Sequence, residues 1–476
     1  MKLCRLLNRV VVFEIYGDVT TEIKGLSHIS EEVGEDFLFF CIKGTKKDGH
    51  EFAKEAVKRG AAAIVTEKYI SGADAVQVVV KNVRTAMSYI AQNFYDNPAD
   101  KMKLIAVTGT NGKTSVCCLI RGILNAAGKK CGIIGTNGIW VRDERFDSDL
   151  TTPDPIIMNS TLALMYKKGV EYVVFEASAH AISLNKLEGI VADIGVFTNI
   201  SQDHLDFFET MERYTEVKMN YFSRKYLKAA VVNCDDPVGE KLCGKPLVPT
   251  VSYGFDESAH VRAVSLTENK KGVGMDIEFR GEKIHIESKL KGRYNIYNIM
   301  AAVSASLVSG IKTAAIAQGI SETDHIEGRG MRLENDGVSI VVDFAHTPEG
   351  IANILDCLRK ETKGRLITVF GCGGDRDRSK RAKMGEEASK LSDLIVLTED
   401  NSRSENREDI IREIIPGIKV PFRVIEEKKQ AIIEALKCAR EGDTVAVLGK
   451  GAEKTIIRKD GEERHSDLLF IKELIK

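Results

Sequence analysis

The sequence predicts an α/β protein of three domains. Three observations lead to this prediction: the chain has 476 residues, short apolar runs alternate with amphipathic segments of helix length, and the pattern is interrupted twice. At roughly 100–200 residues per domain, this length corresponds to two to four domains. The interruptions lie at residues 96–100 (DNPAD) and near Gly328. The expected domains are therefore residues 1–98, 99–328 and 329–476.

The composition is that of a globular protein. Hydrophobic residues make up 43% of the chain and charged residues 29%, and 68 Lys+Arg against 69 Asp+Glu leave a net charge of −1. Such a chain has no basic field for a polyanion, so no nucleic-acid partner is expected. Apolar runs are short and end at charges, as 10–13 ends at Glu14, so neither a membrane partner nor a signal peptide is expected. Ten cysteines without CxxC spacing are typical of a reduced, cytoplasmic protein.

The predicted elements follow the apolar runs in order. In the first domain, runs at 37–42, 61–65 and 75–80 flank a helical stretch at 52–59, which indicates a small α/β fold. Between 104 and 232 strand-like runs alternate with helices, which indicates a mainly parallel sheet. The pattern then becomes antiparallel between about 250 and 290, before a helix at 295–309. The strand runs of this central domain are 104–107, 132–134, 172–175, 194–197 and 229–232.

The third domain is predicted to be a doubly wound, Rossmann-like parallel sheet. Each of its strands is followed by a polar or glycine-bearing turn, and in such sheets the ligand crevice lies beyond the carboxyl ends of the strands. Four turns are therefore expected to converge on one site. The strands are 339–342, 366–370, 394–397, 422–425 and 444–448, and the turns are 343–346, 371–377, 398–403 and 449–451.

The strongest local signal is a phosphate-binding loop between an apolar strand and a helix. It contains Gly109, Thr110, Asn111, Gly112, Lys113, Thr114 and Ser115. In this context backbone N–H groups and a helix N-terminus face the phosphates, the lysine reaches the outer phosphates, and the hydroxyl after it binds Mg²⁺. Val107 stands where the full GxxxxGK[ST] pattern has its first glycine, so the loop is a shortened P-loop. The alternative is a glycine-rich turn with an exposed lysine.

Together with this loop, six further motifs resemble the Mur ligase family in identity and order. They are Thr151-Thr152-Pro153, EASAHA (176–181), TNISQDHLDF (198–207), YTEVK (214–218), DFAHTP (343–348) and GGDRD (373–377). The resemblance implies a uridine-binding first domain, a central ATPase domain and a third domain that binds an amino acid. It implies an enzyme that phosphorylates a carboxylate with ATP and joins the acyl phosphate to an amine. It is greatest to the members that add the third amino acid to UDP-N-acetylmuramoyl-L-alanyl-D-glutamate, a peptidoglycan precursor.

The same resemblance implies a set of catalytic and metal-binding residues. The implied catalytic residues are Lys113, Glu176, His204, Lys218 and His346, and the implied Mg²⁺ ligands are Thr114, Glu176, His204 and Lys218. Family members carry a carbamylated lysine at the place of Lys218. A free ammonium about 4 Å from Mg²⁺ would be repelled by roughly 8 kcal/mol at an effective dielectric constant of 20, and capture of CO₂ removes that repulsion.

The remaining implied residues bind the substrates. Asn298, Arg329 and Asp343 resemble residues that contact the nucleotide, and the residues for the UDP-dipeptide are Ser27, Thr151, Thr152, Ser178 and Lys186. The amino acid is implied to bind at Asp400, Asn401, Ser402, Arg403, Arg376, Gly449 and Glu453. A DNPR turn marks the members that use meso-diaminopimelate, whose distal carboxylate suits an arginine.

Several departures from the family pattern keep other functions open. Ser402 replaces the proline of that turn, Ala452 replaces a histidine, and Lys186 replaces an arginine. A paralogous ligase that adds L-lysine or another amino acid to a related carboxylate is the first alternative. A folylpolyglutamate-synthetase-like ligase and a non-catalytic, nucleotide-switched binding module are the others.

Overall fold

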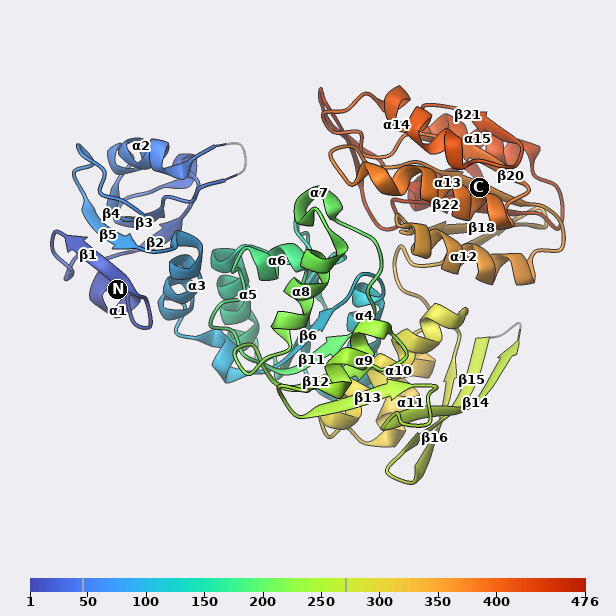
Figure 1. Cartoon of the computed structure of the whole chain (residues 1–476), viewed down its shortest axis with the longest axis horizontal. Coiled ribbons are helices and arrows are strands. Elements are labelled where there is room, and N and C mark those ends of the chain that lie inside the picture. Colours follow the sequence, from blue (N-terminus) through green and yellow to red (C-terminus); the bar gives the residue numbers. More distant parts are fainter. Residues whose placement is uncertain (45–46, 270–271) are drawn as a thin grey trace.

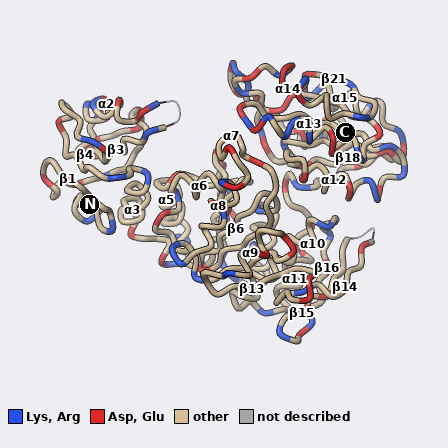
Figure 2. The backbone as a smooth tube through the Cα atoms, in the orientation of Figure 1, with Lys and Arg blue, Asp and Glu red and all other residues tan. Residues whose placement is uncertain are grey.

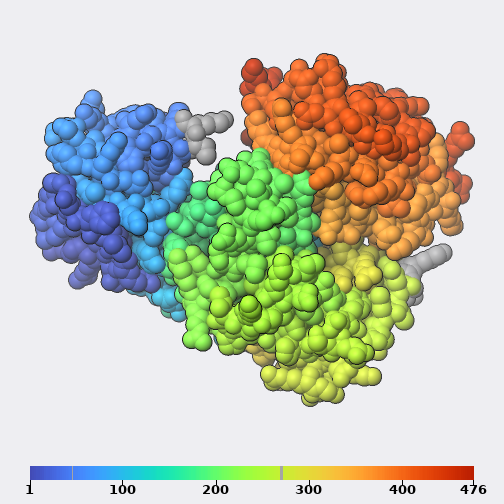
Figure 3. Space-filling model, viewed as in Figure 1, coloured from blue at the N-terminus to red at the C-terminus, as the bar shows by residue number. Residues whose placement is uncertain are grey.

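The computed structural model describes residues 1–44, 47–269 and 272–476. Three α/β domains follow one another along the chain, each built on its own sheet, with the central domain between the other two (Figure 1). Figure 3 shows a gap between the outer domains above the central one. Acidic and basic residues are interspersed over all three domains (Figure 2), as the net charge of −1 suggests. In the described ranges, no helix combines the length and apolar character that crossing a membrane requires.

The first domain has a five-stranded sheet of order β1-β5-β4-β3-β2. Strands β2 to β5 are parallel, and β1 is antiparallel to β5. The helix predicted at 52–59 is present, and the last helix starts after the capping side chain of Asn82 and packs on the sheet. The elements are α1 Leu3–Leu6, β1 Val12–Tyr16, β2 Gly25–Ser27, η1 Ser30–Glu32, β3 Phe37–Phe40, η2 Gly49–Phe52, α2 Ala53–Lys58, β4 Ala61–Thr66, β5 Val76–Val80 and α3 Val83–Phe94.

The central domain has an eleven-stranded sheet of order β16-β15-β14-β13-β12-β11-β6-β10-β7-β8-β9. Its helices cover both faces of the sheet and enclose two large apolar clusters. The elements are η3 Pro98–Lys101, β6 Lys103–Thr108, α4 Lys113–Ala126, β7 Cys131–Gly135, β8 Gly138–Val141, β9 Glu144–Phe146, α5 Pro155–Lys167, β10 Tyr172–Glu176, α6 Ala179–Ser183, β11 Ala192–Phe197, α7 Leu205–Phe208, α8 Met211–Tyr221, β12 Leu227–Asn233, α9 Pro237–Gly244, β13 Thr250–Gly254, β14 Val261–Asn269, β15 Gly272–Phe279, β16 Glu282–Ser288, α10 Arg293–Val308 and α11 Thr313–Glu322.

The predicted parallel sheet is confirmed for the run from β14 to β7, in which all neighbouring strands are parallel. Two details differ from the prediction. The antiparallel part that follows β13 starts later than residue 250, because β13 and β14 still pair in parallel and the antiparallel pairs there are β14–β15 and β15–β16. A second antiparallel hairpin, β8 and β9, extends the opposite edge. Both hairpins lie at edges, where antiparallel strands need no crossover helix.

The third domain has a six-stranded sheet of order β17-β18-β22-β19-β20-β21, parallel except for β17, and a separate β23-β24 hairpin. The doubly wound prediction is confirmed, with helices on both faces. The elements are β17 Met331–Asn335, β18 Val338–Asp343, α12 Pro348–Glu361, β19 Leu366–Phe370, η4 Arg378–Lys380, α13 Arg381–Leu391, β20 Leu394–Leu397, α14 Arg407–Ile414, η5 Ile415–Gly417, β21 Phe422–Val424, α15 Lys428–Cys438, β22 Thr444–Leu448, β23 Thr455–Arg458, β24 Gly461–Arg464 and α16 Asp467–Leu474.

Candidate active site

The phosphate-binding loop joins the end of β6 to the start of α4, as the sequence predicts. Two of its glycines are required by the geometry. Gly109 has φ +147°, and a Cβ there would lie 1.9 Å from Thr198 Oγ1. Gly112 has φ +90°, and a Cβ there would lie 2.3 Å from Asn298 Oδ1. The loop therefore packs tightly against the β11 end and α10, and its amides stand at the start of a long helix, where anions are stabilised.

Two lysine side chains converge on this loop. Lys113 Nζ donates hydrogen bonds to the carbonyl oxygens of Gly109, at 3.0 Å, and Thr110, at 2.8 Å. Lys218 Nζ, from α8, donates to the same Gly109 oxygen at 2.8 Å. Burial lowers the pKa of Lys113, and burial together with the charge of Lys113 holds the pKa of Lys218 well below its usual value. Two lysine amines in this place suit a ligand that carries several negative charges, because a bound anion favours their protonated forms.

The next polar group joins the helix start to the neighbouring strands. Thr114 Oγ1 donates to Glu176 Oε1 at 3.0 Å, and the same hydroxyl accepts from Arg329 Nη2 at 3.0 Å. The backbone N–H of Thr136 donates to Glu176 Oε1 at 2.8 Å. Glu176 is the last residue of β10 and is buried. The predicted metal pair, Thr114 and Glu176, is therefore adjacent to the third-domain arginine predicted to reach the nucleotide.

The predicted residues for the UDP-dipeptide in the central domain lie together beside Glu176. Thr152 Oγ1 donates to the Glu176 carbonyl oxygen at 2.6 Å and lies 3.1 Å from Ser178 Oγ. Lys186 Nζ donates to the Thr152 carbonyl oxygen at 3.4 Å, and the Thr151 hydroxyl lies 3.0 Å from that of Thr136. Burial lowers the pKa of Lys186.

Three side chains gather around Asp203, which no part of the sequence analysis assigned a role of its own. Asp203 Oδ1 lies 3.0 Å from Lys380 Nζ, and its Oδ2 lies 3.3 Å from His204 Nε2 and 3.6 Å from His346 Nε2. Lys380 and His346 belong to the third domain, so this cluster joins the two domains. Although burial opposes it, the positive charge of Lys380 holds the pKa of Asp203 well below its usual value. Burial lowers the pKa of His204 to about 3.

The residues predicted to contact the nucleotide come from both domains. Asn298 lies against the P-loop at Gly112. Asp343, at the end of β18, accepts hydrogen bonds from the backbone N–H groups of Gly330 and Ala345, both at 2.7 Å, and burial raises its pKa. The Arg329 guanidinium lies over the Phe344 ring, 4.3 Å from its centroid. These contacts bring residues 329 and 343 to one side of the helix start.

The turn predicted to bind the amino acid is buried and held by a lysine that sequence reasoning missed. Lys450 Nζ donates to Asn401 Oδ1 at 2.9 Å and to Glu453 Oε2 at 2.8 Å, and it lies 3.7 Å from Asp400 Oδ1. Asn401 Nδ2 donates to Glu453 Oε2 at 3.0 Å. Gly449, with φ +113°, allows close approach, since a Cβ there would lie 2.5 Å from Asp400 Oδ2.

Two arginines border the same turn. Arg403 Nη1 donates to the Gly374 carbonyl oxygen at 2.8 Å and to that of Asn401 at 3.3 Å. Burial and the charge of Arg376 both lower the pKa of Arg403. Arg376 Nη1 also lies 3.8 Å from Asp206 Oδ2 of the central domain. Ser402 is buried, and its carbonyl oxygen packs against Gly374 of the GGDRD loop.

The predicted residues therefore form two groups, and one residue stands apart. The P-loop group and the third-domain group meet at Asp203 and Arg329. Ser27 lies in β2 of the first domain, where its hydroxyl donates to the Ile29 carbonyl oxygen at 2.9 Å. The polar residues that sequence reasoning missed are Thr136, Asp203, Lys380 and Lys450. Asp203 lies inside the TNISQDHLDF motif, Lys450 lies inside the predicted turn 449–451, and Lys380 follows GGDRD by three residues, so position was the available signal for these three.

Comparison with known proteins gives consistent matches along the chain. Three family models match: "Mur ligase family, catalytic domain" over residues 22–95, "Mur ligase middle domain" over 107–306, and "Mur ligase, glutamate ligase domain" over 328–451. A UDP-N-acetylmuramoyl-L-alanyl-D-glutamate--2,6-diaminopimelate ligase 1 of Clostridium acetobutylicum is 39% identical, over 100% of this chain and 99% of the relative. A UDP-N-acetylmuramoyl-L-alanyl-D-glutamate--2,6-diaminopimelate ligase of Aquifex aeolicus is 38% identical, over 96% of this chain and 94% of the relative.

Solved structures agree with the fold. A UDP-N-acetylmuramoyl-L-alanyl-D-glutamate--2,6-diaminopimelate ligase superposes with a TM-score of 0.70 at 27% identity, over 100% of this chain and 98% of the other. The folylpolyglutamate synthase of Mycobacterium tuberculosis superposes with a TM-score of 0.63 at 15% identity, over 77% of this chain and 92% of the other. The second likeness concerns the fold alone.

Proposed function

Since this chain belongs to the Mur ligase family, we propose that it joins meso-diaminopimelate to UDP-N-acetylmuramoyl-L-alanyl-D-glutamate at the expense of ATP, in peptidoglycan precursor synthesis. One observation carries the proposal: the third domain, which carries the amino-acid turn, contacts the P-loop domain through the Asp203–Lys380 ion pair and the hydrogen bond from Arg329 to Thr114. The names and coverage of the full-length relatives support the same reaction. We further propose a cytoplasmic location, and domains that meet at residues 98 and 328.

The proposed reaction needs phosphate charge to be neutralised and an acyl oxyanion to be stabilised. We propose that Lys113 contacts the transferred phosphoryl group, so Lys113→Ala should abolish ligation. A ligation rate close to that of the wild type in this variant would contradict the assignment. Phosphate release measured with ATP, the UDP-dipeptide and the amino acid is the assay.

The residues around Thr114 suit a magnesium ion. Mg²⁺ is held by one or two carboxylates together with substrate phosphates, and Thr114 and Glu176 offer a hydroxyl and a carboxylate in contact with each other. The buried Nδ1 atom of His204 has no hydrogen-bond partner among the described residues. The lowered pKa favours the neutral imidazole, and Asp203 Oδ2, 3.3 Å from Nε2, favours the proton on Nε2, so that Nδ1 keeps its lone pair. We propose that Thr114 and Glu176 hold one Mg²⁺, that His204 helps to hold a second, and that a carbamylated Lys218 is a further ligand. These ions would neutralise the phosphate charge when bound.

Carbamylation of Lys218 requires the neutral amine. The lowered pKa of Lys218 favours that form, so its nitrogen can form a bond to the carbon of CO₂ and release a proton to solvent. Lys218→Ala should be nearly inactive and should regain part of its activity when short-chain carboxylic acids are added. Lys241→Ala, at an exposed lysine of α9, is the control and should stay active. Intact mass measured under CO₂ that shows an unmodified Lys218, together with a failed rescue, would contradict the proposal.

The choice of amino acid is the most specific part of the proposal. Arg403 and Asn401 would bind the distal carboxylate, Glu453 would bind the distal ammonium, and Arg376 would complete the pocket. Loss of a charge-assisted pair in Arg403→Ala should lower kcat/KM for meso-diaminopimelate by about 30- to 1000-fold, or roughly 2–4 kcal/mol. Lysine should be a poor substrate of the wild type and should gain relative to meso-diaminopimelate in the variant.

An amino-acid screen of phosphate release decides between this proposal and its main alternative. If the wild type uses lysine as well as meso-diaminopimelate, or uses neither, the assignment of the amino-acid turn is wrong and a paralogous ligase is the better description. Ser402 in place of proline leaves the turn more backbone freedom, so we expect weaker discrimination than a proline-bearing turn gives.

A further inference from the structure

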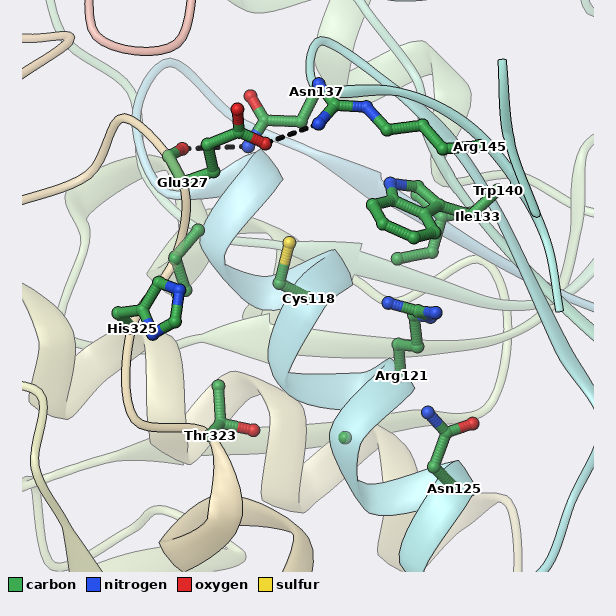
Figure 4. Close-up of a pocket in the computed structure, with 12 residues that line it drawn as sticks. Cys118, Arg121, Asn125, Ile133, Asn137, Trp140, Arg145, Thr323, His325 and Glu327 are labelled. Atoms are coloured by element: carbon green, nitrogen blue, oxygen red, sulfur yellow. Dashed lines mark hydrogen bonds and ion pairs between the residues drawn. The ribbon is translucent and has the colours of Figure 1, made fainter. Parts of the chain in front are cut away.

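A cavity of about 310 Å³ lies behind the P-loop helix, and Asn137 and Arg145 of its lining also border a small pocket next to Arg329 and Glu453. It is bounded by the middle turns of α4, by strands β7 and β8, and by residues 323–327, which lead from α11 into the third domain (Figure 4). The α4 residues in its lining are Cys118, Arg121, Gly122 and Asn125, whereas Lys113 and Thr114 of the first turn do not line it. This cavity is therefore separate from the P-loop site on the same helix.

Two arginines and the single tryptophan of the chain form the distinctive wall of this cavity. The guanidinium carbon of Arg121 lies 4.3 Å from the centroid of the Trp140 ring, and that of Arg145 lies 5.6 Å from it. In Figure 4 the two arginines flank the indole on opposite sides. Stacking on the indole holds both guanidinium groups in place without using their hydrogen-bond donors.

Both arginines keep unsatisfied donors. The Nε atoms of Arg121 and Arg145 are buried and have no hydrogen-bond partner among the described residues. Arg145 Nη1 donates to Glu327 Oε2 at 2.6 Å. Arg121 Nη2 donates to the Arg142 carbonyl oxygen at 3.0 Å, and its nearest carboxylate, Asp143, is 3.8 Å away and 94% exposed. Buried donors without partners are costly, so an oxyanion near Arg121 would be stabilised.

The rest of the lining sets the size and character of an occupant. Ile133 and Ile326 offer apolar surface, and Asn125 and His325 offer polar groups. The volume of about 310 Å³ is at the lower end of small-molecule sites, which range over roughly 300–1,000 Å³, and exceeds what a lone inorganic ion needs. The geometry points to a second ligand site, which binds a small organic oxyanion: a phosphate ester or carboxylate on an apolar, ring-sized body, with its charged group at Arg121.

Trp140 provides a direct measurement of occupancy, because the chain has 1 tryptophan and it forms part of the cavity wall. The wild-type protein is titrated with phenyl phosphate, and in a second series with benzoate, while tryptophan emission is recorded. We expect a saturable change with a Kd at or below about 1 mM for at least one of them. The comparison of the two series tells a phosphate ester from a carboxylate. Benzyl alcohol, which has the ring without the charge, should give no saturable change.

Three variants locate the binding. Arg121→Gln should weaken it by at least about tenfold, as expected for loss of a charge-assisted hydrogen bond. Arg412→Gln, the same change at an exposed arginine of α14, should leave it unchanged. Lys113→Ala should also leave it unchanged, because the P-loop is a different site. If Arg121→Gln does not fold by circular dichroism, Arg145→Gln replaces it.

Three results would overturn the inference. They are the absence of saturable emission changes with both oxyanions, unchanged affinity in the folded arginine variant, and loss of binding in Lys113→Ala. The measurement does not involve turnover, so it is independent of the proposed ligase activity.

Discussion

The buried ion pair between Asp203 and Lys380 should control closure of the third domain onto the central one. Asp203 Oδ1 and Lys380 Nζ are 3.0 Å apart, and both side chains are 6% exposed. At that distance the Coulomb attraction is about 5 kcal/mol at an effective dielectric constant of 20, before the cost of desolvation. Removing one partner of a buried pair costs about 3–5 kcal/mol, because the other charge is left without compensation. Replacing Lys380 by methionine keeps a long unbranched side chain and removes its charge.

The expected loss lies at the lower end of that range, because the domains can separate and allow water to reach Asp203. A loss of about 3 kcal/mol corresponds to roughly a 100-fold decrease in kcat/KM for ligation, provided that reaction requires the closed arrangement. Folding of the separate domains should change little, since the pair joins two domains rather than stabilising either core. The assays are phosphate release under limiting substrate, and solution scattering with an ATP analogue and the UDP-dipeptide.

Lys383→Met is the matched control. Lys383 is exposed, lies in α13 and donates across the same interface to Gln202 Oε1. Because exposed polar contacts contribute little, this variant should stay within about threefold of the wild type. The reasoning is refuted if Lys380→Met has nearly wild-type kcat/KM, or if it compacts on ligand binding as the wild type does.

Two further predictions concern the P-loop and the third-domain core. Gly109→Ala should lose ATP binding, measured by calorimetry, because its Cβ would lie 1.9 Å from Thr198 Oγ1. Gly128→Ala is the control: no atom lies within 4 Å of the added Cβ, so it should cost only about 1 kcal/mol of folding stability. Hydrogen bonding to the buried Arg381 lowers the pKa of Glu405 from 4.5 to about 2, so its contribution to stability is complete above pH 4.5 and is lost as pH falls toward 2. Glu405→Gln should therefore lower the free energy of unfolding by about 3 kcal/mol at pH 7 and by much less near pH 2 in urea titrations; an equal loss at both pH values would contradict this.

The sequence predicts the strands and the P-loop well because both depend on local patterns. The apolar runs 104–107 and 172–175 become neighbouring parallel strands, and the GKT segment begins a helix directly after one of them. The convergence of the third-domain turns was also predictable, because parallel strands place their carboxyl ends at one edge. Asn401 and Glu453 accordingly lie in contact, although 52 residues separate them.

The remaining features depend on contacts that no local pattern encodes. The β8–β9 hairpin is short and partly exposed, so its alternation is too brief to distinguish it from a loop. Lys380 follows the GGDRD loop, and its local sequence is typical of an exposed lysine. Its partner Asp203 is 177 residues away and lies in another domain, so the pairing depends on the contact between the domains. Lys450 likewise has the local sequence of a glycine-rich turn, and only the fold shows that it is buried and bonded to Asn401 and Glu453.

The positive charge of the site explains why substrates and domain closure should depend on each other. Lys113 and Lys218 both donate to the Gly109 carbonyl oxygen, so two amines share one acceptor in a buried place. Closure adds Arg329 next to Thr114, which increases the positive charge further. Each of these groups loses solvation by burial, and repulsion between like charges adds to that cost. A bound triphosphate, or a carbamate on Lys218, supplies the negative charge that offsets both effects. The closed arrangement is therefore most stable with anions present, which favours nucleotide binding before the third domain closes.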